Sequence, residues 1–194
     1  MPKPAETIYL ASNSPRRLQL LNLIGIFPSV LQPDFHENIP FNPDAGIYAT
    51  EIALGKLHSV IDPAPEGIII TADTVVQCEQ QYLAKPADYD DACRMLLKLS
   101  GNWHSVVTGC ALKNLKNGKI LTIFEQTKVH FKQLSEQEIE AYAQSGMCYD
   151  KAGGYGIQDA FGARFVDRIE GDYYNVVGLP LCSLANSLRS ISDD

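Results

Sequence analysis

Two hydroxyl side chains and two arginines lie close together between Ser12 and Arg17, where the sequence is Ser-Asn-Ser-Pro-Arg-Arg. The stretch follows a short apolar run, and Ser14 and Pro15 are residue types that favour the N-cap and the first position of a helix. A helix start presents backbone N–H groups and a positive dipole end to an anion. Arg16 and Arg17 add charge in the turn where cations are unfavourable for the helix itself, so the loop predicts a bound anion such as phosphate. An ordinary capped helix with two solvated arginines is the alternative.

Asp73 lies inside an apolar run, between the isoleucines 68–70 and the valines 75–76. A carboxylate there is costly to bury unless it is paired, bound to a metal, or placed at a strand end facing a cleft. Asp73 is therefore the candidate for a divalent-metal ligand or a general base, and Thr74 beside it for a hydrogen bond to a ligand or a turn cap. A structural aspartate at a strand bend is the alternative.

Two lysines and a glycine-rich segment complete the polar candidates. Lys56 lies on a predicted helix and Lys85 precedes Pro86, although lone lysines are by default solvated. Within 150–158, three glycines in four residues allow a ligand to approach the backbone closely. Gln158 ends this segment, and its two-faced amide suits the edge of a nucleotide base. A glycine-rich surface turn is the alternative.

The composition predicts one folded domain over residues 1–194 that binds neither nucleic acid nor a membrane. Hydrophobic residues make up 45% of the chain and the net charge is −7, which argues against a nucleic-acid partner but not against a small anion in a locally basic cleft. No stretch is long enough to span a membrane, and the first residues lack the apolar core of a signal peptide. Five dispersed cysteines without a CxxC pair indicate reduced thiols and a cytoplasmic location.

The elements that must position these residues alternate between strands and helices. Hairpins interrupt the parallel pattern, notably at Asn117-Gly118, so we expect an α/β fold with a mixed sheet flanked by helices. A capping box at Ser135–Glu138 marks one helix start. The predicted strands are 7–12, 67–72 continued by 74–78, 104–112, 119–131, 164–169 and 173–177. The predicted helices are 15–24, 44–61, 88–99, 135–145 and 180–190.

Five stretches, taken together and in order, resemble the motifs of the Maf family of nucleoside triphosphate pyrophosphatases. They are LASNSPRRLQLL, ADTVV, KP followed by a helix ending in LSG, KAGGYGIQ, and EGDYYNVVGLPL. The resemblance implies an elongated mixed sheet with helices in two lobes and an active site in the cleft between them. It implies cleavage of a nucleoside triphosphate substrate between its α and β phosphates, with Mg2+ or Mn2+ as the divalent metal cofactor. Relatives in the family often form a homodimer.

The resemblance also implies roles for individual residues. Asp73 matches the catalytic acidic residue and, with Glu37, the metal-binding positions, although the register near Glu37 is irregular. The positions linked to base selection in the branch acting on dTTP and UTP are Arg17, Thr74 and Gln158. The expected phosphate-binding positions are Ser12, Arg16, Lys56 and Lys85. Modified pyrimidine nucleotides are further expected substrates.

Two alternatives and two departures accompany the resemblance. The sister branch acts on 7-methyl-GTP, but it has a tryptophan after the proline of the first motif, where this chain has Arg16. A nucleotide-binding inhibitor of cell division, with secondary catalysis, is the other alternative. Asp159 stands where a glycine commonly follows Gln158, so its carboxylate is expected to alter the pocket or repel a phosphate. Asp172 replaces a small residue in a turn and is expected to be solvated.

Overall fold

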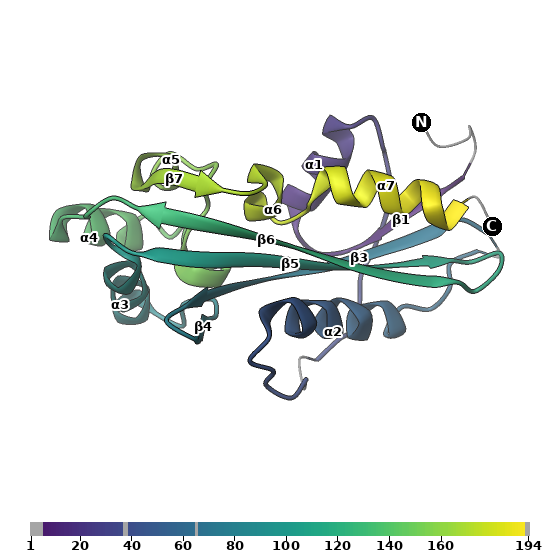
Figure 1. The fold of residues 1–194 in the computed structure, drawn as a ribbon, viewed down its shortest axis with the longest axis horizontal. Coiled ribbons are helices and arrows are strands. Elements are labelled where there is room, and N and C mark those ends of the chain that lie inside the picture. Colours follow the sequence, from purple (N-terminus) through teal and green to yellow (C-terminus); the bar gives the residue numbers. More distant parts are fainter. Residues whose placement is uncertain (1–5, 37–38, 65, 193–194) are drawn as a thin grey trace. The chain divides into compact units, whose positions relative to one another are not determined.

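The computed structural model describes residues 6–36, 39–64 and 66–192, which build a mixed sheet with flanking helices (Figure 1). The strand order is β2-β1-β3-β5-β6-β7, and β4 pairs with β3. β1 is parallel to β2 and β3, whereas the β3–β4 and β6–β7 pairs are antiparallel. The predicted mixed sheet is thus confirmed. Across the described ranges, no helix has the length and apolar character needed to cross a bilayer.

The longer elements lie within a few residues of the predicted bounds, whereas the predicted strand 164–169 begins only at Val166 because Gly162–Phe165 is helical. The strands are β1 (Ile8–Ala11), β2 (Ser29–Leu31), β3 (Ile68–Cys78), β4 (Gln81–Leu83), β5 (Trp103–Asn114), β6 (Ile120–Phe131) and β7 (Val166–Glu170). The α-helices are α1 (Pro15–Leu23), α2 (Ala45–His58), α3 (Tyr89–Leu99), α4 (Glu136–Gln144), α5 (Gly162–Phe165), α6 (Tyr173–Val177) and α7 (Leu181–Ser192). A short 3-10 helix, η1, covers Ala152–Gly154. The three-residue strands β2 and β4 lay outside the predicted strands, because three residues carry too little periodicity to reveal a strand.

The described residues form two compact units, each assembled from separated stretches of chain. The first unit contains the described residues up to Asp73, then Thr108–Glu125 and the chain from Gly178 onward. The second unit contains Thr74–Val107 and Gln126–Val177. The strands β3, β5 and β6 therefore contribute residues to both units.

In the first unit, α2 packs with its backbone almost directly on β5. A Cβ atom at Gly109 would lie only 2.4 Å from the backbone of Ala49 and Thr50, so no larger residue fits there without displacing the helix. The hydroxyl of Thr71 on β3 donates to the carbonyl oxygen of Ala53 on α2 at 2.7 Å. These contacts set the register of α2 against β3.

The second unit has an aromatic core into which α3 and α4 contribute apolar faces. The centroids of the Phe131 and Tyr155 rings lie 4.7 Å apart in an edge-to-face arrangement. The capping box predicted at the start of α4 is confirmed, since the Ser135 hydroxyl accepts from the Glu138 amide and the Glu138 carboxylate accepts from the Ser135 amide.

Residues 173–177 form the helix α6, so the prediction of a strand there is wrong. Two tyrosines and two valines favour a strand locally, but Asp172 and Asn175 override that preference. The Asp172 carboxylate accepts from the amide of Tyr174 at 2.8 Å, so this side chain starts the helix and is only half-buried, not simply solvated as expected. The buried Asn175 carboxamide donates to the carbonyl oxygen of Val106 at 3.0 Å and to the hydroxyl of Thr127 at 2.9 Å.

We expect the buried imidazole of His104 to make folding stability depend on pH. Its Nε2 atom lies 2.7 Å from the Tyr155 hydroxyl, and burial lowers the pKa of His104 from 6.5 to about 3. Because the unfolded chain binds this proton more readily, stability falls as pH drops from 6.5 towards 3, by up to about 1.4 kcal/mol per pH unit. Urea unfolding of the wild type between pH 7 and pH 4 measures this slope.

The matched variants for this measurement are His104→Gln and His58→Gln. His104→Gln should lower the slope of the unfolding free energy against pH by about 1.4 kcal/mol per pH unit, the contribution of one proton. His58 is exposed on α2, so its replacement controls for the effect of exchanging a histidine for glutamine at a surface position. An unaltered slope in His104→Gln would show that other groups cause the pH dependence.

Candidate active site

The Ser12 hydroxyl organises the loop between β1 and α1. Its Oγ atom accepts a hydrogen bond from the Ser14 amide at 3.2 Å and from Nη1 of Arg17 at 3.3 Å. The Nε atom of Arg17 donates to the carbonyl oxygen of Gly178 at 2.9 Å. Because Ser12 is buried and Arg17 is bonded at two of its nitrogens, the side chains hold this loop in one shape.

The predicted capping role of Ser14 is only partly correct. Ser14 occupies the N-cap position of α1 with an extended backbone, and Pro15 is the first helical residue, as expected. The Ser14 side chain, however, makes no capping hydrogen bond, and its amide turns back to Ser12 instead. The first turn of α1 contains Arg16 and Arg17 and no acidic residue, so its charge is uniformly positive.

The Arg17 guanidinium is affected by its burial and by the charges of Asp73 and Arg16. Burial lowers the pKa of Arg17 from its ordinary value, and the negative charge of Asp73 acts in the opposite direction. The positive charge of Arg16 lowers that pKa further. The guanidinium still keeps its charge at neutral pH, so the first unit offers fixed positive charge beside a carboxylate.

Asp73 on β3 forms an ion pair with Lys56 on α2, through Oδ1 and Nζ. The two side chains are only 15% and 16% exposed, so the pair is largely withdrawn from water. The carboxylate within an apolar strand thus has the partner that its burial requires. Thr71 lies two residues before Asp73 on β3, and Ala53 lies about one helical turn before Lys56 on α2. The Thr71–Ala53 hydrogen bond therefore brings Lys56 next to Asp73.

The donor set around Asp73 suits a cation that is held largely by substrate and water. Among the described residues, no three His, Cys, Asp or Glu side chains gather closely enough to hold a metal on their own. Mg2+ commonly binds one or two carboxylates together with phosphate oxygens and water, which fits a site with Asp73 as protein ligand. Glu37, the second predicted metal ligand, lies outside the described residues.

In the second unit, three of the recognised motifs pack on one another. The amide of Gly153 donates to the carbonyl oxygen of Ala84 at 3.1 Å, next to Lys85. A Cβ atom at Gly154 would lie 3.0 Å from Cγ of Pro86, and one at Gly153 equally close to Cγ1 of Val76. The glycines are therefore needed for close packing, and the Lys85-Pro86 segment is held against η1.

The predicted site residues divide between the two units. Ser12, Arg16, Arg17, Lys56 and Asp73 belong to the first unit, and Thr74, Lys85 and Gln158 belong to the second. Within the second unit, Lys85 and Gln158 are exposed and Thr74 is half-buried. Asp73 and Thr74 are consecutive, so one peptide bond joins the two groups of residues.

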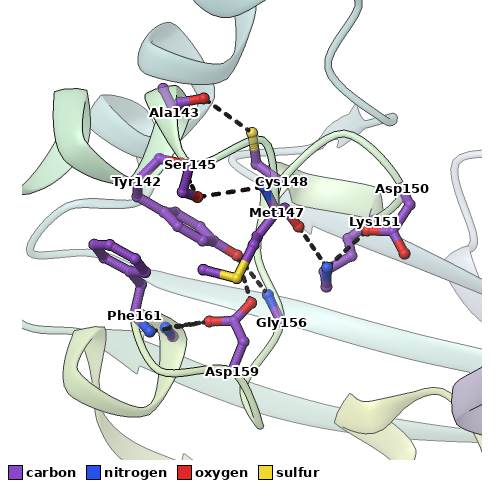
Figure 2. A network of polar contacts seen from close by, with 11 residues as sticks. Tyr142, Ala143, Ser145, Met147, Cys148, Asp150, Lys151, Gly156, Asp159 and Phe161 are labelled. Atoms are coloured by element: carbon purple, nitrogen blue, oxygen red, sulfur yellow. Dashed lines mark hydrogen bonds and ion pairs between the residues drawn. The ribbon is translucent and has the colours of Figure 1, made fainter.

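The carboxylate of Asp159 accepts hydrogen bonds from α4 and from the loop that follows it (Figure 2). Its Oδ2 atom accepts from the hydroxyl of Tyr142 at 2.7 Å. Its Oδ1 atom accepts from the amides of Gly162 at 2.7 Å and Phe161 at 3.2 Å. These bonds give the departure from glycine a structural role, and both carboxylate oxygens are committed to it.

Sequence reasoning gave no role to two residues that bond to the motif side chains: Tyr142, which bonds to Asp159, and Gly178, which bonds to Arg17. Tyr142 lies beside Ile139 and Ala143 on the apolar face of α4, so its pattern is that of an ordinary core residue. Gly178 acts through its carbonyl oxygen, and a backbone acceptor leaves no signal in the residue type.

Comparison with known proteins identifies the family. A family model described as Maf-like protein matches residues 7–191. The chain is 46% identical over 177 residues to a dTTP/UTP pyrophosphatase of Vibrio cholerae, covering 90% of this chain and 92% of the relative. It is 44% identical over 174 residues to one of Thermosipho africanus, with 90% and 87% covered, and 41% identical over 189 residues to one of Geotalea uraniireducens, with 97% of each covered. The motifs, the mixed sheet and these matches show that the chain belongs to the Maf family.

Proposed function

We propose that this protein hydrolyses dTTP and UTP to the nucleoside monophosphate and inorganic pyrophosphate, with a divalent cation such as Mg2+ or Mn2+. The observation that carries the proposal is the identity of 41–46% to proteins named dTTP/UTP pyrophosphatase over at least 90% of this chain. The Ser12, Arg17, Lys56 and Asp73 cluster supports it, because it combines positive charge with a carboxylate.

The reaction requires water to attack the α-phosphorus in line with the bond to the bridging oxygen. That bond breaks, pyrophosphate leaves, and the attacking water loses a proton. Arg16, Arg17 and Lys56 would offset the negative charge of the triphosphate and align it. Asp73 would accept the proton from water or hold the cation, which when bound polarises phosphate oxygens. Lys85 and Gln158 are the proposed phosphate and base contacts from the second unit.

A hydrolysis panel tests the proposal. The purified chain, freed of metal with EDTA and given Mg2+ or Mn2+, is assayed for pyrophosphate release from dTTP, UTP, 5-substituted pyrimidine triphosphates and 7-methyl-GTP. We expect kcat/KM for dTTP and UTP to exceed that for 7-methyl-GTP by about 100-fold or more. Without added metal, turnover should fall to background.

Each alternative has its own outcome in this panel. A preference for 7-methyl-GTP would place the chain in the sister branch. Tight binding of nucleotides without turnover in the presence of metal would favour a binding regulator of cell division. The homodimer implied by the family is a further proposal, which light scattering of the same preparation tests.

A further inference from the structure

The buried hydroxyl of Tyr142 connects two points of the glycine-rich loop in the second unit. It donates to Oδ2 of Asp159 at 2.7 Å and accepts from the amide of Gly156 at 3.2 Å (Figure 2). The ring stacks on Phe161 with centroids 5.0 Å apart and meets the edge of Phe165 at 5.5 Å. Packing against Phe161 and Phe165 therefore holds the ring that α4 carries, and its hydroxyl bonds to both ends of the segment from Gly156 to Asp159.

The phenol is suited to this role at every physiological pH. Burial, followed by the hydrogen bond to Asp159, raises the pKa of Tyr142 far above its usual range. The hydroxyl therefore keeps its proton and remains a donor to the carboxylate. The Tyr142–Asp159 hydrogen bond is charge-assisted, and such bonds are shorter and stronger than neutral ones.

Further hydrogen bonds tie the loop backbone to itself and to α5. The Asp159 amide donates to the carbonyl oxygen of Gly156 at 3.1 Å, and the Ala163 amide donates to that of Asp159 at 3.0 Å. A Cβ atom at Gly156 would lie 2.6 Å from Cε of Lys151, and one at Gly162 only 2.0 Å from the Gly156 carbonyl oxygen. Both positions therefore require glycine for the close packing of this loop.

Gln158 is the exposed residue within this closely bonded segment. The residues from Gly153 to Ile157 are buried, whereas the Gln158 side chain is exposed. A glutamine side chain has several rotatable bonds, so it can contact one edge of a base reproducibly only when its backbone is fixed. The loop bonds supply that condition for the exposed side chain of Gln158.

We propose that Tyr142 and Asp159 are positioning residues that hold Gln158 at the correct distance from the pyrimidine base. The inference rests on the proposed function, in which Gln158 contacts the base. The hydroxyl of Tyr142 acts through Asp159 and Gly156 and does not itself touch the nucleotide. Its loss loosens the loop and weakens base binding without removing any group that acts on the phosphates.

The test is a double-mutant cycle between Tyr142→Phe and Gln158→Ala, with KM and kcat for dTTP as readouts. We expect Tyr142→Phe to raise KM about 10-fold and to change kcat by less than about 3-fold. In the Gln158→Ala background the same substitution should leave KM unchanged, because the residue it positions is absent. A purely structural effect would appear equally in both backgrounds.

Tyr149→Phe is the matched control. It removes a phenolic hydroxyl from the same unit, one that donates to the carbonyl oxygen of Ala143 at 3.4 Å, whereas the Tyr142 hydroxyl bonds to Gly156 and Asp159. Its KM for dTTP should equal that of the wild type. Asp159→Ala breaks the same contacts from the other side and replaces Tyr142→Phe in the cycle should the latter fail to fold by circular dichroism.

The outcomes separate the two proposals. A wild-type chain that hydrolyses neither dTTP nor UTP overturns the proposed function. A wild-type chain that hydrolyses them, together with a Tyr142→Phe effect that is absent or undiminished in the Gln158→Ala background, overturns the positioning role alone.

Discussion

Asp73→Asn is expected to reduce kcat for dTTP hydrolysis by about a thousandfold while leaving the chain folded. The amide keeps the shape of the carboxylate and an oxygen that can accept from Lys56, so the ion pair becomes a neutral hydrogen bond. It can neither accept a proton from water nor bind a cation well. The loss therefore falls on the chemical step, and kcat should change far more than KM.

Steady-state kinetics of pyrophosphate release measure this effect, with Asp62→Asn as the control. Asp62 pairs with Lys113 at 2.7 Å in the same unit, so it is a second Lys–Asp pair without a proposed role in the reaction. Raising the Mg2+ concentration should restore part of the Asp73→Asn activity if the carboxylate is a metal ligand, and none if it is the base. Activity within tenfold of wild type would remove Asp73 from the reaction.

Lys56→Met is expected to reduce kcat/KM for dTTP by about 100-fold. Methionine has a similar length and no charge, so the substitution removes one of the cations that we propose to face the triphosphate. It also leaves Asp73, which is only 15% exposed, without its ionic partner. Both consequences oppose binding of a polyanion, so KM should rise together with a fall in kcat.

Lys113→Met provides the comparison, because it breaks the Lys–Asp pair that has no proposed role. That variant should keep wild-type kinetics. The melting temperatures of both variants show whether a loss of activity comes from a less stable fold or from the missing charge. If Lys56→Met and Lys113→Met have the same kcat/KM, the Lys56–Asp73 pair serves folding alone.

The sequence predicts the long elements well because their patterns are long. Eleven residues of β3 and fourteen of α2 repeat their apolar spacing often enough to be recognised. The helix α6 is five residues long and depends on hydrogen bonds of Asn175 to residues 69 and 48 positions away, which no local pattern contains.

The candidate site shows the same limit. The position of Asp73 in an apolar strand predicts that it needs a partner, but the choice of Lys56 follows from how Thr71 and Gly109 seat α2 on the sheet. The assignments of Arg16, Thr74, Lys85 and Gln158 rest on the family resemblance and remain predictions. For Asp159, the hydroxyl that engages it comes from Tyr142, a residue that the sequence presents only as apolar core.

The hydrogen bond from Arg17 to the carbonyl oxygen of Gly178 spans 161 positions of the chain. During synthesis from the N-terminus, the arginine loop therefore leaves the ribosome well before the residue that anchors it. The second unit, which ends at Val177, has its whole sequence available before the first unit receives α7. A nascent chain thus carries the arginines before it carries the acceptor that shapes their loop.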